Sequence, residues 1–324
     1  MIIDIAAHLI PPRLLERVRR LTGRAALAVA DTVPGLCDLD EQRRTVERFA
    51  DHGYRQVLSL ASQVTEDAAC RPHQSGICSA ANEELRELVE REPACFVGAL
   101  GALPMDDPNA ALREVDHLVE LELPGFQAYS NVFGRPLDDP PILEVLEYAF
   151  SRGLVCLLHP VRGPVPDYRT EERSRYGLFH VLGQPYETSL ALLRLTLSGL
   201  FDRQPQSVLI AHHLGGMIPF FASRIEAHYR HGEPDLRVAL PRNPIEYLQS
   251  CYGDTALGGG PHAIRCGVEF FGSERVVFGS DYPFDGQAGI SLIQRTIDAV
   301  ERTGLDQAQR RAIYEGNARR VLGL

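Results

Sequence analysis

Residues 1–12 read MIIDIAAHLIPP, and this segment separates two possible α/β architectures. Residues 2–5 form a short apolar run rich in isoleucine, which is typical of a buried strand. An open doubly wound sheet with a second domain would need a glycine-rich phosphate turn directly after such a strand. These twelve residues contain no glycine, and the segment ends in two prolines. The start of the chain therefore disfavours the doubly wound sheet.

Seven further short apolar runs follow the first, separated by longer segments with the period of amphipathic helices. The eight predicted strands are residues 2–5, 55–60, 95–103, 125–129, 154–159, 207–212, 250–256 and 275–281. The main helical segments between them are residues 82–92, 108–122, 141–153, 187–201, 219–230 and 291–303. Such alternation is typical of β–α units around a parallel sheet, and eight units can close into a barrel. We therefore predict an α/β fold, a distorted (β/α)8 TIM barrel.

The chain has 324 residues, which exceeds the roughly 250 residues of a minimal barrel. The excess is predicted to form two insertions, residues 10–40 after the first strand and residues 161–185 after the fifth. Both would lie above the C-terminal face, where barrel enzymes carry their chemistry. No linker rich in glycine, proline or serine divides the sequence, so a single domain over residues 1–324 is predicted.

Composition excludes several classes of function. The 33 basic and 43 acidic residues give a net charge of −10, so we expect neither nucleic acid nor a membrane surface as a partner. Every basic residue is arginine, which rules out a Schiff-base lysine, a P-loop lysine and a carboxylated lysine between two metals. Seven scattered cysteines without a C-x-x-C pair, and a start without a basic leader, predict a cytoplasmic protein.

Polar residues at the ends of apolar strands are the first candidates for a site, because a polar group beside a core is costly unless it is paired. His8, His159, Asp281 and the pair His212 and His213 follow four of the predicted strands. Brought together in a barrel, they would form a mononuclear site for zinc or manganese. Adjacent residues on an extended segment point to opposite faces, so at most one of His212 and His213 is expected to face the barrel axis.

The sequence resembles the amidohydrolase-related proteins typified by aminocarboxymuconate-semialdehyde decarboxylase and γ-resorcylate decarboxylase. The likeness rests on MIIDIAAHLIPP, on LPGFQAYSNVFGRPLDDPPILEVLEYAFSRGLVCLLHP, and then on AHHLGGMIPFFASRI, YGDTA, VVFGSDYPF and YEGNARRVLGL, in that order. The resemblance implies a distorted barrel with one divalent metal at its C-terminal mouth and no organic cofactor. The absence of lysine agrees with a mononuclear site.

The resemblance also implies a ligand set. Its first strand usually carries H-x-H, or a glutamate in the first of those places, and both flanking residues bind metal. Here the first place is Ala6, which cannot coordinate a cation. The implied protein ligands are therefore His8, His159 and Asp281, with Zn2+ expected and Mn2+ as the alternative.

The histidine after the sixth strand is implied to handle a proton beside the metal. Counting to Pro219 and Arg224 favours His213 for this role, with His212 as the alternative because the strand could also end there. Asp281 is the second implied proton-handling group.

Substrate-binding candidates are mainly arginines, because a guanidinium binds a carboxylate through two parallel hydrogen bonds. Arg162 follows His159 closely in the sequence. The resemblance adds Arg224, which could reach the site of a neighbouring subunit, and Arg43 or Arg44 after the first insertion. Gln127 stands where related two-metal hydrolases place a lysine.

The resemblance implies an enzyme, a nonoxidative decarboxylase of a small aromatic or unsaturated carboxylic acid. Two alternatives stay open. The same set of residues could instead deprotonate a metal-bound water, and the enzyme would then hydrolyse a lactone or amide or act as a hydratase. Ala6 also allows a binding homologue without catalysis. A homodimer or higher homo-oligomer that pairs through the segment near Arg224 is implied as well.

Overall fold

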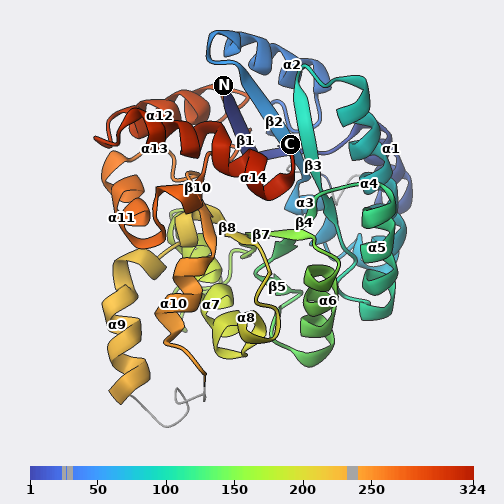
Figure 1. The fold of residues 1–324 in the computed structure, drawn as a ribbon. Coiled ribbons are helices and arrows are strands. Elements are labelled where there is room, and N and C mark those ends of the chain that lie inside the picture. The colour runs from blue at the N-terminus through green and yellow to red at the C-terminus, as the bar shows by residue number, and fades with distance from the viewer. Residues whose placement is uncertain (24–26, 28–31, 232–239) are drawn as a thin grey trace.

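The computed structural model describes residues 1–23, 27, 32–231 and 240–324. One sheet of eight parallel strands has the order β1-β2-β3-β4-β7-β8-β9-β10, and Figure 1 shows it at the centre of the molecule. The strands are β1 (Ile2–Leu9), β2 (Tyr54–Leu60), β3 (Phe96–Ala102), β4 (Gly125–Tyr129), β7 (Val155–His159), β8 (Leu209–Ala211), β9 (Tyr252–Asp254) and β10 (Val276–Val277). A small antiparallel hairpin of β5 (Asn131–Val132) and β6 (Arg135–Pro136) follows β4.

The sheet closes on itself between β1 and the segment that follows β10. The main-chain nitrogen of Ile5 donates to the carbonyl of Phe278 at 3.0 Å, and that of Tyr282 donates to the carbonyl of Ala6 at 3.1 Å. A further bond of 3.0 Å runs from the nitrogen of His8 to the carbonyl of Tyr282. These bonds make the sheet a nearly closed barrel, so the predicted TIM-barrel class is confirmed.

Each of the eight predicted runs overlaps one strand of the barrel. The first strand was predicted too short, because it continues past Ile5 to Leu9. Ala6 and Ala7 carry little β-propensity of their own. They are nevertheless extended because the segment lies between two partners, β2 on one side and the residues after β10 on the other.

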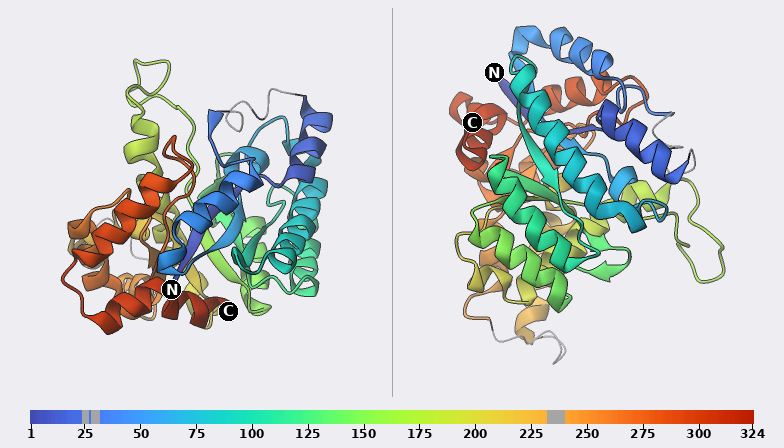
Figure 2. Two further views of the ribbon diagram at one scale, coloured as in Figure 1. Left: turned by 90° about the horizontal axis from the view of Figure 1, so that it is seen from above. Right: turned by 90° about the vertical axis from the view of Figure 1, so that its right-hand side faces the viewer.

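Helices cover the outside of the barrel (Figures 1 and 2). They are α1 (Pro12–Thr22), α2 (Leu39–Arg48), α3 (Ser62–Thr65), α4 (Gln74–Arg91), α5 (Pro108–Glu120), α6 (Pro140–Ser151), α7 (Gln184–Leu197), α8 (Leu200–Arg203), α9 (Ile218–His231), α10 (Pro244–Ser250), α11 (Pro261–Phe271), α12 (Ile290–Glu301), α13 (Gln307–Arg311) and α14 (Asn317–Leu322). The six predicted helical segments overlap α4, α5, α6, α7, α9 and α12. In the described part of the chain, no helix is long and apolar enough to cross a bilayer.

The two predicted insertions leave the barrel after β1 and after β7. The first includes α1 and returns to the strand through a main-chain bond of 2.7 Å from the nitrogen of Ile10 to the carbonyl of Leu36; residues 24–26 and 28–31 of this segment lie outside the described residues. The second projects from the side of the molecule opposite both termini, as the yellow-green segment before α7 in Figure 2. It ends in a π-helical turn, Phe179–Gly183. Their assignment as insertions stays a prediction.

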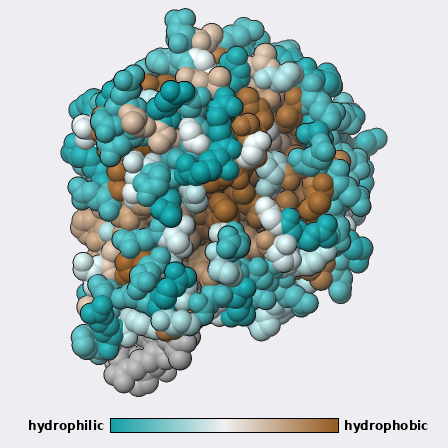
Figure 3. All heavy atoms as spheres, viewed as in Figure 1, coloured by the Kyte–Doolittle hydropathy of each residue, from teal (hydrophilic) through white to brown (hydrophobic). Residues whose placement is uncertain are grey.

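Apolar side chains fill the half of the barrel that lies nearer the two chain termini. A buried cluster takes a residue or two from most of the strands: Ile3, Ile5, Val57, Leu100, Val155, Leu157, Ile210 and Val277. Ala318 and Leu322 of α14 close it from the side of the termini. On the face drawn in Figure 3, apolar side chains gather toward the centre and hydrophilic ones surround them. The polar ends of the strands are therefore left for the opposite mouth.

Asp4 is a fully buried charge at the seam of the barrel. Its Oδ1 accepts hydrogen bonds from the main-chain nitrogens of Ala6 and Ser280, each at 3.0 Å. Its Oδ2 accepts from the hydroxyl of Tyr54 at 2.6 Å and from that of Ser280. Burial raises the pKa of Asp4 to about 6, although all of these donors oppose the rise. The carboxyl group ties β1 to the residue that precedes Asp281.

We expect the substitution Asp4→Ala to lower the free energy of unfolding at pH 7 by about 3 kcal/mol, because buried main-chain and hydroxyl donors lose their acceptor. Urea unfolding followed by circular dichroism measures this change. The exposed Asp51 supplies a control, and Asp51→Ala should stay within about 0.5 kcal/mol of the wild type. Equal losses in the two variants would contradict a structural role for Asp4.

The stability that Asp4 contributes is also expected to depend on pH. The pKa of Asp4 is raised from 3.8 to about 6 by folding, so the folded protein binds a proton more tightly than the unfolded chain. Its contribution to stability is therefore complete below about pH 4 and falls as the pH rises to about 6. The stability difference between wild type and Asp4→Ala should shrink over that interval.

Candidate metal centre and active site

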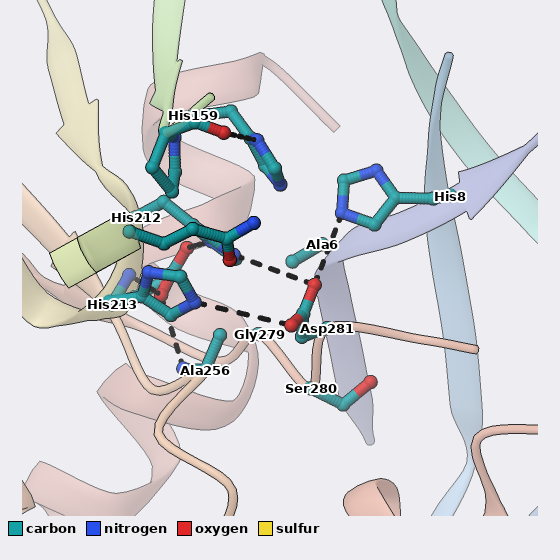
Figure 4. A network of polar contacts seen from close by, with 12 residues as sticks. Ala6, His8, His159, His212, His213, Ala256, Gly279, Ser280 and Asp281 are labelled. Carbon is teal, nitrogen blue, oxygen red and sulfur yellow. Dashed lines mark hydrogen bonds and ion pairs between the residues drawn. The ribbon is translucent and has the colours of Figure 1, made fainter. Parts of the chain in front are cut away.

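Four side chains meet at the C-terminal mouth of the barrel. His8 lies on β1, His159 ends β7, His212 directly follows β8, and Asp281 lies after β10. One ligand atom from each lies within 4.8 Å of the others, and Figure 4 shows the three rings and the carboxylate turned toward one another. The side chains that the sequence analysis grouped at the strand ends therefore do lie together. His212 is among them, although the ligand set implied by the resemblance was only His8, His159 and Asp281.

A β-bulge turns His8 toward this group. The register between β1 and β2 shifts between Asp4 and Ala7. Ile5 belongs to the cluster inside the barrel, whereas Ala7 packs in the layer under the outer helices. Because a bulge adds one residue to one strand, it changes which side chains face inward. His8 therefore faces the mouth, with its Nε2 3.4 Å from Oδ1 of Asp281.

Each imidazole makes a polar contact through its Nδ1 atom, and its Nε2 atom is directed at the centre of the group. The Nδ1 atom of His8 lies 3.0 Å from Oγ of Ser59, and that of His159 lies 2.8 Å from the carbonyl oxygen of Pro160. His212 donates from Nδ1 to Oδ2 of Asp254 at 2.5 Å. Partners of this kind orient metal-binding histidines and fix their tautomer.

His212 and His213 do not point to opposite faces, so that expectation is wrong. The chain leaves the strand at Ala211, and His213 and Leu214 adopt left-handed backbone angles with φ of 55° and 53°. The two rings therefore lie on the same side, with centroids 4.0 Å apart. The Nε2 of His212 is 3.5 Å from Oδ1 of Asp281, and that of His213 is 4.0 Å from Oδ2.

The charges of the group favour a bound cation. Burial alone would raise the pKa of Asp281, but His212 and His8 outweigh it and hold this pKa well below its usual range. Burial disfavours a charged His212, but Asp254 and Asp281 overcome it and raise its pKa to about 10. Burial lowers the pKa of His159 well below its usual range, and His212 and His8 add to this effect. Two carboxylates thus share a site whose imidazoles cannot all be protonated.

The residues present fit a divalent metal ion. The Nε2 atoms of His8 and His212 are buried and have no hydrogen-bond partner among the described residues. An unpaired buried polar atom is costly. Two such atoms directed at one carboxylate indicate a place where a cation binds. Three imidazoles and one carboxylate also form a donor set common to zinc and manganese proteins.

A cavity of about 350 Å³ opens beside the candidate metal ligands. His213, Asp281 and Phe284 lie on its inner side, and His180, Gln184 and Leu257 belong to its outer wall. A second cavity of about 430 Å³ shares His213 and Leu257 with the first. These volumes suit a small organic molecule. None of the described residues lining the first cavity is an arginine.

Arg43 and Arg44 are not brought to this mouth. Arg43 makes two hydrogen bonds to Glu92, at 2.6 and 2.5 Å. Glu92 precedes β3, so this pair lies at the opposite end of the barrel from the histidines. Arg44 is exposed and pairs with Glu41 at 2.6 Å. The sequence position after the first insertion therefore does not place an arginine at the substrate site.

The other three substrate-binding candidates, Arg162, Arg224 and Gln127, lie in three separate places. Arg162 is on the loop after β7, where its Nη1 pairs with Glu187 at 2.8 Å. Arg224 is exposed on α9 and lines a separate groove, not the cavity beside the candidate metal ligands. Gln127 points into the barrel and donates to the carbonyl of Leu60 at 2.9 Å, so its amide supports the wall of the barrel.

Comparison with known proteins identifies the family. The sequence profile of the family described as Amidohydrolase matches residues 3–324. The chain belongs to the amidohydrolase family. It is 32% identical to 2-amino-3-carboxymuconate-6-semialdehyde decarboxylase of Dictyostelium discoideum over 75% of this chain and 65% of that protein, just under two thirds of its length. It is 29% identical to γ-resorcylate decarboxylase of Polaromonas sp., over 88% of each protein.

Solved structures share the fold of this amidohydrolase. The crystal structure of dihydroxybenzoic acid decarboxylase from Polaromonas sp. superposes with a TM-score of 0.83 and covers 100% of this chain and 97% of that one, at 24% identity. That protein carries manganese and the inhibitor 2-nitroresorcinol. The predicted family resemblance is confirmed, and so is the prediction of an enzyme of the amidohydrolase superfamily.

Sequence analysis missed two residues that the site depends on. Asp254 ends β9 and is fully buried, but the predicted strand continued past it to residue 256, so it did not stand out as a residue at a strand end. It was quoted within YGDTA but not assigned a role. Ser59 gave no signal, because a serine inside a strand is common and only the structure shows its contact with His8.

We expect chelation to lower the melting temperature of this amidohydrolase and added Mn2+ or Zn2+ to restore it. A cation at about 100 times its Kd stabilises the folded state by about 2.7 kcal/mol. Thermal unfolding with and without EDTA measures the shift. The variant His8→Ala should lose the cation-dependent shift, whereas the exposed His73→Ala should keep it. A full shift in His8→Ala would contradict the metal centre.

Proposed function

We propose that this amidohydrolase is a metal-dependent, nonoxidative decarboxylase of small aromatic carboxylic acids. The observation that carries the proposal is the set of His8, His159, His212 and Asp281, whose free ligand atoms converge beside a cavity that Phe284 helps to line. The names of the two relatives, both decarboxylases, support it. The 29% identical relative acts on a dihydroxybenzoic acid by name, which favours an aromatic substrate.

His8, His159, His212 and Asp281 would hold the cation. A bound divalent ion supplies a Lewis acid that orients the oxygen atoms of the substrate and withdraws electron density from it. We propose Zn2+ because imidazole predominates among the donors, with Mn2+ as the second candidate because the Polaromonas structure contains it.

His213 is the proposed proton-handling residue. Burial, together with His212, lowers its pKa to about 3, so the imidazole is neutral at pH 7. A neutral imidazole can accept a proton from the hydroxyl or acid group of the substrate. It can then pass this proton to the aromatic carbon of the substrate that carries the carboxylate. The bond between that carbon and the carboxylate then breaks, its electron pair returns to the ring, and carbon dioxide leaves.

The two alternatives lose support. Hydrolysis or hydration would use the same groups, but both named relatives are decarboxylases. The alternative without catalysis depended on Ala6, which cannot coordinate a cation. Four other donors converge without any contribution from that position, so a cation site does not need it.

We expect the purified enzyme, loaded with Zn2+ or Mn2+, to release one carbon dioxide from 2,6-dihydroxybenzoate or a related hydroxybenzoate. The variant His213→Asn should lower kcat roughly 10²–10⁴-fold with unchanged metal content, because proton transfer is lost. The exposed His73→Asn, which lines neither cavity, is the matched control. Hydrolysis of lactones or amides without release of carbon dioxide from any of these acids would overturn the proposal.

We also propose that two copies associate through α7 and α9. Large apolar side chains are exposed on and beside these helices: Val181, Leu182, Tyr186, Leu190, Phe220 and Phe221. A groove of about 340 Å³ between α7, α9 and α10 adds Leu193, Leu197 and Arg224. Clustered apolar surface of this kind is typical of protein interfaces. Arg224 makes no ion pair with a described residue. In such a dimer its guanidinium could reach the carboxylate of the substrate bound to the other copy.

Size-exclusion chromatography with light scattering should show a dimer or a higher homo-oligomer. Phe220 is 78% exposed, and Phe220→Asp would bury a charge in the interface, so we expect the variant to be a monomer. Leu21→Asp, at an exposed leucine of α1, should not change the mass. A monomeric wild type would contradict the proposal.

The compartment is proposed from the thiols. Six cysteines are free in the structure, which supports a reducing, cytoplasmic environment; they are Cys70, Cys78, Cys95, Cys156, Cys251 and Cys266.

A further inference from the structure

We propose that His212, oriented by Asp254, is a metal ligand and takes the coordination place that Ala6 leaves without a donor. This inference rests on the metal-dependent function proposed above. It names which of two adjacent histidines binds the cation and assigns Asp254 as the positioning residue.

Ala6 lies beside the candidate ligands but has nothing to offer a cation. It is fully buried on β1, two residues before His8. A side chain at Gly279 would come within 3.2 Å of the methyl group of Ala6, so position 6 is packed against the segment that carries Asp281. Figure 4 shows this methyl group between His8 and His212. A donor on that side of the group must therefore come from another strand.

His212 is held so that only its Nε2 is available. The side chain is fully buried, and its ring stacks on that of His159 with centroids 4.6 Å apart at 22°. Its Nδ1 donates to Oδ2 of Asp254 at 2.5 Å. Rotation of the ring would break the hydrogen bond and the stack together. The Nε2 atom, which has no hydrogen-bond partner in the described part of the chain, is directed at Asp281.

Asp254 is itself fixed by the main chain around it. Its Oδ1 accepts hydrogen bonds from the nitrogens of His213 and Ala256, at 3.0 and 3.1 Å. The carboxylate is fully buried at the end of β9. A carboxylate that is held by main-chain groups and accepts from a histidine orients that histidine and increases its basicity toward a metal.

The formal charges balance only when Asp254 is counted. Three neutral imidazoles and Asp281 bring −1 to the site, and a divalent ion brings +2. The carboxylate of Asp254 supplies the second negative charge, so the buried group is neutral as a whole. Because an unbalanced buried charge is strongly unfavourable, Asp254 contributes charge as well as orientation.

His213 provides the matched control for His212. The two residues are adjacent, and both rings lie near Asp281. His213 lies farther from that carboxylate, at 4.0 Å from Nε2 to Oδ2, and it lines the cavity instead. The geometry assigns metal binding to His212 and leaves His213 to the substrate.

The test uses the full-length protein, stripped with a chelator and titrated with Mn2+ alone, with free Mn2+ measured by its EPR signal. We expect Asp254→Asn to raise the Kd for Mn2+ about 10–100-fold, the range typical of losing a partner of a metal-binding histidine. His212→Ala should weaken binding further, and His213→Ala should stay within about threefold of the wild type. Wild-type affinity in His212→Ala, or an equal loss in His213→Ala, overturns the ligand assignment. Wild-type affinity in Asp254→Asn overturns its positioning role.

A second measurement keeps the inference testable if His212→Ala fails to fold. Pulsed EPR of the Mn2+-loaded wild type counts the directly bound imidazole nitrogens. Three such nitrogens support the assignment, and two overturn it. Neither measurement needs a substrate, so the two proposals fail separately. Binding of Mn2+ through His212 without release of carbon dioxide would contradict only the proposed reaction.

Discussion

Closure of the barrel between β1 and the segment after β10 is the constraint on which the site depends. His8 and Asp281 come from opposite ends of the sequence and lie 3.4 Å apart only because the first strand pairs with the last segment. Asp4 connects the two sides through Ser280, the residue before Asp281. The same buried carboxyl that closes the sheet therefore positions a candidate metal ligand, and the fold and the site share one set of contacts.

The barrel and three of the four convergent side chains could be predicted from the sequence for one physical reason. Buried strands of a parallel sheet are continuous apolar runs, and a polar residue that ends such a run must lie where the strands end. His8, His159 and Asp281 satisfy this rule. The rule says nothing about irregular backbone, so it could not foresee the bulge between Asp4 and Ala7.

The expectation that only one of His212 and His213 faces the barrel axis failed at the same kind of irregularity. Alternation of side chains applies to extended backbone, and the chain leaves that conformation at His213, where φ is 55°. Arg43 failed for a different reason. Position in the sequence placed it after the first insertion, but α2 runs back to the start of β3, where Glu92 neutralises it. Long-range pairing of this kind cannot be derived from spacing alone.

The site is also unfavourable for stability, which argues that it is kept for chemistry. His213, Leu214 and Asp281 adopt left-handed backbone angles without being glycine, at a cost of about 1–3 kcal/mol each. Buried carboxylates and crowded imidazoles add an electrostatic cost that packed apolar residues would avoid. A cation bound at the centre would offset that electrostatic cost, and it would do so only in the folded barrel, where residues from β1, β7, β8 and the segment after β10 meet. Cation binding and closure of the barrel are therefore expected to stabilise each other.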